Sequence, residues 1–389
     1  MTDFYFVQPQ DVLMLRGNKS FGDAGEHGEA VMPPWPSLFS GAFRSALLGQ
    51  DAAQLARFTN FTNGQRLEGA LGEVLGTPAV PGAFRINWVS LAQLAHGAAA
   101  NLSCAIPLPA DLLAFADADL PLLEALHPAS PTIGSATAAA LPLTARLRRR
   151  KADKPDSGHW LTGDGLTKHL SGRLPAKTIT TACLYKREPR LGIALDSSTR
   201  TAKDGAIYTT EAIAFTPDAG FLIGIDGLQN QLPASGLLRL GGDGRGAAYR
   251  RIEFTPPAAP LDSITSDQRF RLVLATHGLF AQGSLPERVE RQSDGSYRLN
   301  GAGFAARLAC AAVPRHEVVS GWDLAQWQPK PAQRVAPTGS VYWFDQFEGD
   351  AGKLANWVAG GLWGDNPDSQ RQAEGFNRAW LAAWPHHPA

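Results

Sequence analysis

Cysteine is scarce in this sequence and no hydrophobic run is long, and each shortage excludes a class of protein. The cysteines, Cys104, Cys183 and Cys310, are odd in number and far apart, so they form neither a disulfide framework nor a Cys-x-x-Cys metal knuckle. No stretch approaches about 18 uninterrupted apolar residues, which excludes a transmembrane helix. The first residues carry Asp3 and no basic run before an apolar block. We therefore expect no signal peptide and a cytoplasmic protein.

The sequence also lacks the signatures of several enzyme classes. It has no Gly-x-Ser-x-Gly elbow and no phosphate loop ending in Gly-Lys-Ser/Thr, so hydrolases and nucleotidases of those types are excluded. His316-Glu317 is not followed by the second histidine of a zinc-protease helix. Asp117 and Asp119 are more typical of a solvated helix face than of a cation site. We expect no metal and no cofactor.

What is present fits a folded protein with more than one domain. The chain has 389 residues, of which 44% are apolar and 19% are charged, so a sizeable core is available and wholesale disorder is excluded. At about 150 residues per domain, this length favours two domains.

The net charge of zero conceals a strong asymmetry along the chain. Residues 1–141 contain 6 Lys/Arg and 12 Asp/Glu, whereas residues 142–190 contain 12 Lys/Arg and 4 Asp/Glu. One short block therefore holds a third of the basic residues. Such a local excess attracts a polyanion even when the whole protein is neutral.

The order of the predicted elements indicates an α+β fold. Phe4–Val7 is a predicted strand, and apolar residues at helical spacing predict a helix that starts at an N-cap, Ser37, and stops at Gly49. Further strands are expected at 207–215, 221–225 and 248–254, with the first two joined as a hairpin and a short helix at 227–232. Without residues 51–200, the order is strand, helix, strand, strand, helix, strand, which is ferredoxin-like (RRM-like).

The predicted domain organisation follows from this order. A proline-rich linker at 256–260 separates a first domain, residues 1–255, from a second, residues 261–389. The first domain carries a basic, loop-rich insertion at about 51–200, within which 110–127 is partly helical. In the second domain, strands are expected at 270–275, 306–313 and 340–344, and helices at 354–358 and 370–384. We expect a second ferredoxin-like unit there.

A glycine cluster at 241–246 has three possible roles. Its pattern superficially fits a dinucleotide fingerprint, but that motif needs a helix after it, and residues 248–254 predict a strand. The other possibilities are a wide turn, or a backbone-amide cradle for a nucleic-acid phosphate helped by Arg239, Arg245 and Arg250. The spacing alone leaves these two open.

Two further features suggest anion or RNA binding, each with a plainer alternative. Ser37 at a helix N-terminus, with Arg44 two turns along, forms either an anion site or an ordinary capped helix with a solvent-facing arginine. The basic block around Arg148–Lys151, with Trp160 and the histidines His159 and His169, forms either a solvated loop or a single-strand RNA surface that uses charge and stacking.

Several stretches, in order along the chain, resemble a known family. Residues 11–22 (DVLMLRGNKSFG) and 33–47 (PPWPSLFSGAFRSAL) resemble the opening of Cmr subunit three, a RAMP-superfamily family of type III-B CRISPR effector complexes. Similar stretches follow at 190–196 (RLGIALD) with 207–208 (IY), at 238–243 (LRLGGD), and at 320–323 (SGWD) with 330–331 (KP) and 338–342 (TGSVY).

The resemblance implies two ferredoxin-like units and no catalytic role. It implies a subunit that holds the 5′ handle of the CRISPR RNA (crRNA). The implied protein partners are the large polymerase/cyclase-like subunit and the adjacent backbone RAMP subunit, and target RNA is an indirect partner. Gly241, Gly242 and Gly244 match the superfamily's glycine-rich loop, and Ser37 and Arg44 fall on its first helix.

From the residues and the resemblance together we predict one set of RNA-binding residues. They are Arg16, Lys19, His27, Ser37, Arg44, Arg148, Arg149, Arg150, Lys151, Trp160, Arg239, Gly241, Gly242, Gly244 and Arg245. The alternative is a metal-independent RAMP endoribonuclease that processes precursor crRNA. His27 or His159 would then be the base, and Lys19 or Lys151 would stabilise the developing charge.

Overall fold

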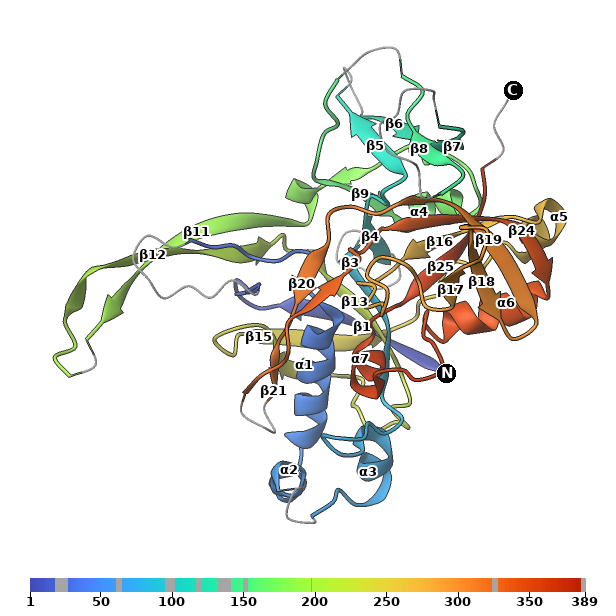
Figure 1. Ribbon diagram of the computed structural model, residues 1–389. Coiled ribbons are helices and arrows are strands. Elements are labelled where there is room, and N and C mark those ends of the chain that lie inside the picture. The colour runs from blue at the N-terminus through green and yellow to red at the C-terminus, as the bar shows by residue number, and fades with distance from the viewer. Residues whose placement is uncertain are drawn as a thin grey trace. The chain divides into compact units, whose positions relative to one another are not determined.

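The chain forms two units, each built from segments that are distant in sequence (Figure 1). The computed structural model describes residues 1–17, 27–60, 65–94, 102–116, 121–131, 141–149, 153–196, 198–323 and 328–385. Unit 1 comprises Met1–Leu102, Thr181–Glu253 and Val318–Gln333; unit 2 comprises Ser103–Thr180, Phe254–Glu317 and Arg334–Ala389. The chain passes between units beside the expected linker at 256–260. Residues 103–180, which we expected to belong to the first domain, group instead with unit 2.

An antiparallel sheet forms the body of unit 1. The strands of this eight-stranded sheet that form the body of unit 1 are, in spatial order, β3 (Arg85–Leu94), β13 (Ala219–Asp226), β1 (Thr2–Pro9), β15 (Gly246–Ile252) and β14 (Ser235–Arg239). All neighbouring strands in this series pair antiparallel. β1 lies at the centre, and β14 forms an edge.

Helix α1 (Pro36–Leu48) covers one face of this sheet. The Phe39 ring lies 4.9 Å from that of Phe221, and the Phe43 ring lies 5.6 Å from that of Tyr5. Both phenylalanines are fully buried, and burying such a side chain stabilises a fold by about 1.5–3 kcal/mol. Because Phe221 pairs with Val7 near the end of β1, the N-terminus of α1 lies at that same end of the sheet.

The rest of unit 1 consists of short helices and ribbons. The helices α2 (Ala52–Thr59) and α3 (Gly69–Leu75) follow α1, and the Asp51 side chain caps α2. A three-stranded sheet contains the long hairpin β11 (Tyr185–Leu195) and β12 (Ala202–Phe215), with β2 (His27–Gly28) parallel to β12. Short ladders pair β20 (Glu317–Val319) with β23 (Gln333–Val335), and β21 (Trp322–Asp323) with β22 (Gln328–Pro329).

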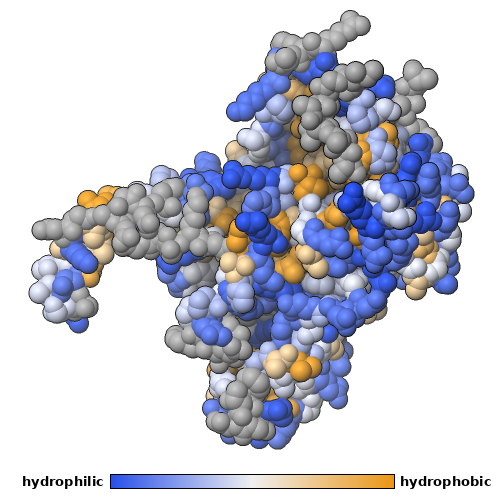
Figure 2. All heavy atoms as spheres, viewed as in Figure 1, coloured by the Kyte–Doolittle hydropathy of each residue, from blue (hydrophilic) through white to orange (hydrophobic). Residues whose placement is uncertain are grey.

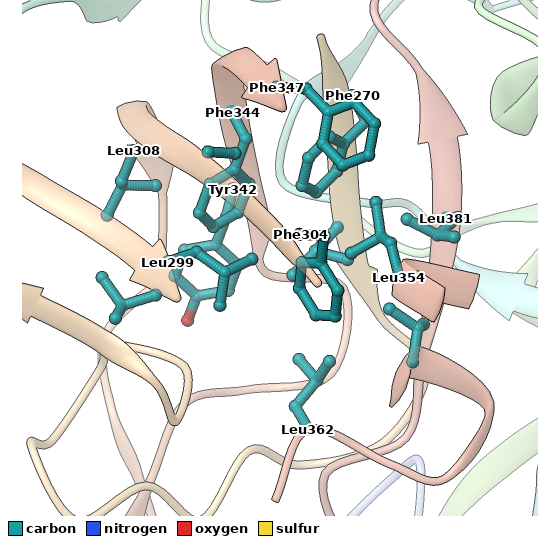
Figure 3. Packing of buried hydrophobic residues seen from close by; sticks show 14 of the residues in the cluster. Phe270, Leu299, Phe304, Leu308, Tyr342, Phe344, Phe347, Leu354, Leu362 and Leu381 are labelled. Atoms are coloured by element: carbon teal, nitrogen blue, oxygen red, sulfur yellow. The ribbon is translucent and has the colours of Figure 1, made fainter. Parts of the chain in front are cut away.

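Unit 2 is built on a six-stranded antiparallel sheet. Its spatial order is β17 (Val289–Arg291), β18 (Tyr297–Gly301), β19 (Phe304–Ala312), β24 (Val341–Gly349), β16 (Phe270–Leu274) and β25 (Ala379–Ala383). Its helices are α5 (Leu261–Asp267), α6 (Ala351–Ala359) and α7 (Ser369–Glu374). An apolar core fills the space between the sheet and α6, with the Phe270 and Phe344 rings stacked at 4.9 Å (Figure 3).

The segment 103–180 adds small ladders and a helix to unit 2. β4 (Leu102–Pro107) pairs with β9 (His159–Thr162), which pairs with β10 (Ile179–Thr180). β5 (Leu112–Phe115) pairs with β6 (Leu122–Ala125), and β7 (His127–Ala129) with β8 (Thr144–Arg146). Helix α4 is Gly163–Leu170, and a 3₁₀ turn at Thr181–Cys183 begins the return to unit 1.

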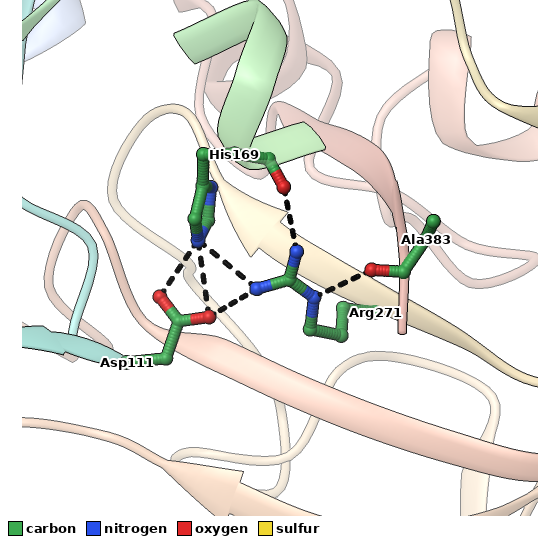
Figure 4. Close-up of polar contacts among 4 residues, drawn as sticks. All are labelled: Asp111, His169, Arg271 and Ala383. Atoms are coloured by element: carbon green, nitrogen blue, oxygen red, sulfur yellow. Dashed lines mark hydrogen bonds and ion pairs between the residues drawn. The ribbon is translucent and has the colours of Figure 1, made fainter. Parts of the chain in front are cut away.

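A buried polar cluster joins this segment to the six-stranded sheet (Figure 4). Arg271 is the one charged residue of β16, whose other residues are apolar. Its guanidinium forms an ion pair with Asp111, donates to the His169 carbonyl at 2.7 Å and donates to the Ala383 carbonyl at 2.9 Å. A charge in a protein interior is tolerated when it is paired and hydrogen-bonded. This cluster is one of the contacts between residues 103–180 and the rest of unit 2.

Four strands of each main sheet share one spatial order. In unit 1 the spatial order is β3-β13-β1-β15, and in unit 2 it is β19-β24-β16-β25. In both, the second of the four strands along the chain comes first in space, followed by the third, the first and the fourth. The helices differ. In unit 1, α1 lies between the first and second strands, whereas in unit 2, α6 and α7 lie between the third and fourth.

Several sequence predictions were confirmed, including the strands at 4–7, 248–254 and 270–275 and the helix that ends at Gly49. The helix predicted at 227–232 was wrong: Gly227, Gln229 and Asn230 all have positive φ, which an α-helix does not contain. The predicted hairpin was also wrong, because β12 and β13 belong to different sheets.

Two other predicted helices correspond largely to strands. Residues 112–115 and 122–125 form the β5–β6 hairpin. The helix predicted over 370–384 ends at Glu374, because Gly375 is left-handed at φ 93° and Asn377 has φ 60°. The apolar residues that follow pair with β16 instead.

Candidate nucleic-acid interface

A tight hairpin turn contains the glycine cluster, at the end of the unit 1 sheet where β1 ends. Asp243 and Gly244 have φ of 59° and 60°, the positive values at both central positions that a type I′ turn requires. The Leu240 amide donates to the Arg245 carbonyl at 2.8 Å. β15 follows directly, so the dinucleotide interpretation fails for lack of a helix.

The glycines allow a neighbouring segment to approach closely. Gly241 has φ 77°, and a Cβ there would lie 2.9 Å from the Met14 carbonyl oxygen. The Gly242 amide donates to that same oxygen at 2.8 Å. The amide of Gly242 is therefore already used within the chain, so it is not available to a phosphate in this arrangement.

The three arginines around this turn have different surroundings. Arg245 forms an ion pair with Asp11. The Val12 amide, followed by the charges of Arg245 and Arg190, lowers the pKa of Asp11. Arg239 is exposed, and the Arg250 guanidinium lies 5.5 Å from the centroid of the Phe6 ring. Neither Arg239 nor Arg250 has a carboxylate partner within the described part of the chain.

The loop that precedes α1 is tied to the long hairpin. The Glu211 carboxylate accepts from the Ala30 amide at 3.1 Å and from Arg187 at 2.7 Å, and Arg187 also donates to the Ala30 carbonyl at 2.8 Å. The backbone of His27 pairs with Thr209. These contacts were not predicted, because Arg187 and Glu211 lie 157 and 181 residues from Ala30.

Three predicted residues belong to this loop. Arg16 is exposed and its backbone forms an isolated bridge with Ala30. Because Met14 is bridged to Gly242, Arg16 also lies close along the chain to the glycine turn. Lys19 and the side chain of His27 lie outside the described residues.

The structure does not bring Ser37 and Arg44 into one anion site. The N-cap of α1 is Trp35, Pro36 is the first helical residue, and Ser37 comes second, so predicting Ser37 as the cap was wrong. Pro36 fits because the first helical position needs no amide hydrogen. The Arg44 guanidinium lies 5.3 Å from the Phe84 ring centroid. Since Phe84 immediately precedes β3, this places Arg44 toward the other end of the helix.

The predicted residues of the basic block lie in unit 2 and are partly occupied by internal contacts. Arg149 forms ion pairs with Glu124 and Asp153 and lies 3.9 Å from the Phe115 ring centroid. The bond to Asp153 contributes most to raising its pKa. Arg148 is exposed, whereas Arg150 and Lys151 lie outside the described residues.

Trp160 is only 5% exposed, and its strand, β9, is paired with β4 on one side and with β10 on the other. It offers no open face to a base, so the expectation that it stacks on RNA was wrong. The sequence could not show this, since the partners of β9 lie more than 15 residues away on either side.

The described residues contain no group of three His, Cys, Asp or Glu that could hold a metal ion. Among them, no helix is long and apolar enough to cross a membrane.

The chain is similar in fold to a solved structure of a type III-B Cmr-beta bound to cognate target RNA and AMPPnP. The TM-score is 0.51 and the sequence identity 13%, over 97% of this chain and 95% of that chain. A second structure, of a type III-B Cmr-beta bound to cognate target RNA, has a TM-score of 0.51 and 14% identity, over 97% of this chain and 96% of that chain. No curated protein sequence matches significantly. The profile of the CRISPR-associated protein family Cas_Cmr3 matches residues 5–384. The chain belongs to the Cas_Cmr3 family of CRISPR-associated proteins.

Proposed function

We propose that this protein is a non-catalytic, crRNA-binding subunit of a type III-B CRISPR effector complex, acting in the cytoplasm in antiviral defence. The observation that carries the proposal is the family match over residues 5–384. We infer that the subunit holds the 5′ handle of the crRNA, docks the large polymerase/cyclase-like subunit and contacts the adjacent backbone RAMP subunit.

Charge at one end of unit 1 supports RNA binding there. Arg16 and Arg239 are exposed, and both lie close along the chain to the contact between Met14 and Gly242. Single-stranded RNA is held largely through its phosphates, and exposed cations attract it at long range. Asp11 offsets the charge of Arg245, so Arg245 contributes less than its position suggests.

The β11–β12 hairpin supports a protein partner. Leu191 and Ile193 alternate along β11 and therefore share one face. Ile193 pairs with Ile207 of β12 on that face, and Leu195 follows beyond a shift in the register. The exposed fractions of Leu191, Ile193 and Leu195 are 74%, 45% and 61%, with 51% for Ile207. Figure 2 shows hydrophobic surface on the outer part of this ribbon. An exposed apolar face of this kind marks a protein interaction site, and we propose a neighbouring subunit as its occupant.

We also propose that both units are ferredoxin-like domains of the RAMP type, each of which has replaced one helix. The shared strand order supports this, as does the complementary placement of α1 in unit 1 and α6 in unit 2. In unit 1 the second helix is replaced by β14, and in unit 2 the first is replaced by β17 and β18.

Co-purification tests the assembly. We expect the full-length chain, co-expressed with the other subunits of its complex and a crRNA, to be recovered with the large subunit and with RNA carrying an intact 5′ handle. Recovery of the large subunit after nuclease treatment separates direct protein contact from bridging by RNA. A complex that assembles fully and protects the handle without this chain would contradict the proposal.

A further inference from the structure

At the edge formed by β14 and β15, the unit 1 sheet has one face toward α1 and a second face that α1 does not cover. Antiparallel partners point to the same face and neighbours along a strand to opposite faces. Tyr5, Val7 and Tyr249 point toward α1. The face turned away from α1 therefore carries Phe6 and, on β15, Ala248 and Arg250.

The alternation continues on the edge strand β14. Leu238 pairs with Ala247 on the α1 side and is buried, with 5% of its surface exposed. Leu237 pairs with Ala248 on the opposite side and is 74% exposed. Arg239 pairs with Gly246, and Ser235 with Arg250, on that same opposite side.

These residues form a shelf with a cation at each end, which we call the Arg239–Arg250 shelf. Arg239 lies opposite Gly246, and Arg250 lies four residues further along β15. At about 3.3 Å per residue, the backbone positions of Gly246 and Arg250 are about 13 Å apart. Between them are the small residues Gly246 and Ala248 and the exposed Leu237. No bulky side chain from β15 separates the arginines.

No carboxylate of the described residues balances the charges of the shelf. Within the described residues, neither Arg239 nor Arg250 has a carboxylate partner, whereas Arg245 in the adjoining turn is paired with Asp11. The Phe6 ring supports the Arg250 guanidinium at 5.5 Å and limits its freedom. Guanidinium groups bind phosphates bidentately and also stack on bases.

We propose that the Arg239–Arg250 shelf binds a short stretch of single-stranded RNA, with phosphates at the two arginines and a base resting on Leu237. This inference rests on the proposed RNA-holding function and names a binding surface for it. RNA fits better than a protein partner because one exposed leucine is far less apolar surface than a stable protein interface buries, which is about 800 Å² per partner. Covering Leu237 with a base also removes apolar surface from water.

Binding of a fluorescein-labelled 12-nucleotide single-stranded RNA to the full-length chain tests this proposal. We expect Arg239→Ala to weaken binding on the order of tenfold, and to reduce the slope of log affinity against log salt by about 0.7, the change for one lost phosphate contact on a single strand. Leu237→Ser should weaken binding at unchanged salt slope. Arg291→Ala, which removes an exposed arginine of unit 2, is the matched control and should have no effect.

Arg250→Lys keeps the charge but loses the planar group, so it should preserve the salt slope while lowering affinity. Thermal unfolding verifies that each variant is folded. Because Arg239 is exposed, Arg239→Ala still tests the proposal if the Arg250 variant does not fold. If the wild-type chain binds RNA and Arg239→Ala binds it with the same affinity and the same salt slope, the shelf proposal is overturned but the proposed function is left intact. The same variants can be co-expressed and co-purified with the other subunits and a crRNA. Loss of a protein subunit rather than of RNA in that co-purification would also overturn the proposal. A wild-type complex that binds no crRNA would contradict both proposals.

Discussion

His169 Nε2 lies 2.9 Å from Asp111 Oδ1, and both side chains are at least 97% buried. The same Asp111 carboxylate pairs with Arg271 of β16, so two segments separated by a hundred residues share one charge cluster. Burial alone would raise the pKa of Asp111, but His169 and Arg271 outweigh it and hold that pKa at about 2. Asp111 therefore stays ionised and compensates the buried guanidinium.

Asp111→Asn should destabilise the protein severely. The variant leaves the Arg271 charge buried without a counter-charge, and breaking a buried pair in this way costs about 3–5 kcal/mol. Urea unfolding, followed by fluorescence, measures the change.

Asp164→Asn provides the matched control. Asp164 pairs with Lys168 on the exposed side of α4 at 2.7 Å, and such surface pairs contribute about 0–1 kcal/mol. Equal loss of stability in the two variants would show that the cluster does not hold residues 103–180 in place.

His169 should make stability depend on pH. Burial is the main cause that lowers the pKa of His169 below its usual value, so the folded state binds a proton less readily than the unfolded state. The stability that depends on neutral His169 is therefore fully present when the pH is above about 6.5, the pKa of a histidine in an unfolded chain. It falls as the pH drops below that pKa. We expect a lower urea midpoint at pH 5.5 than at pH 7.5, and His169→Gln should flatten this difference. An unchanged pH dependence in that variant would assign the effect to other histidines.

Gly241→Ala should destabilise the glycine turn, while Gly246→Ala should not. At position 241 alanine would have φ 77° and a Cβ 2.9 Å from the Met14 carbonyl oxygen, and strain of this kind costs about 1–3 kcal/mol. At Gly246 no atom lies within 4 Å of the added Cβ. Calorimetry would show a lower Tm for the first variant only. Similar melting temperatures would mean that the close approach of Met14 is not a constraint.

Leu191→Asp should abolish association with a neighbouring subunit without unfolding the chain. Leu191 is 74% exposed, so the charge is solvated in the free protein but would have to be buried at an interface. Lys186→Asp lies on the opposite face of the same ribbon and changes the charge by a larger amount, so it serves as control. Size-exclusion chromatography with the partner subunits gives the comparison. Full assembly of Leu191→Asp would remove the hairpin from the interface.

Local pattern was sufficient to predict some elements and insufficient for others. Helix α1 and strands such as β16 were predictable because their apolar residues recur at helical spacing or in a short run bounded by turn residues. The failures depend on distant partners. Residues 379–383 form β25 because they pair with β16, more than a hundred residues earlier. The strand of Trp160 likewise pairs with strands that are distant in the sequence, and local pattern does not show that this side chain is buried.

The candidate site shows the same division. The glycine turn could be located from sequence, because Asp-Gly between two strands is a hairpin signal. The pairing of Arg245 with Asp11, which lowers its value as an RNA contact, joins residues 234 positions apart. Composition and spacing therefore could not predict which arginines have no carboxylate partner among the described residues.

Binding and cleavage of labelled precursor crRNA, followed together in EDTA with and without the large subunit, test the central claim most directly. The account predicts salt-sensitive binding of RNA that contains the handle, stronger with the large subunit present, and no cleavage. Specific cleavage in EDTA that disappears in His27→Ala or His159→Ala would contradict it in favour of a metal-independent endoribonuclease. Absence of binding with the partner present would contradict the RNA-holding role itself.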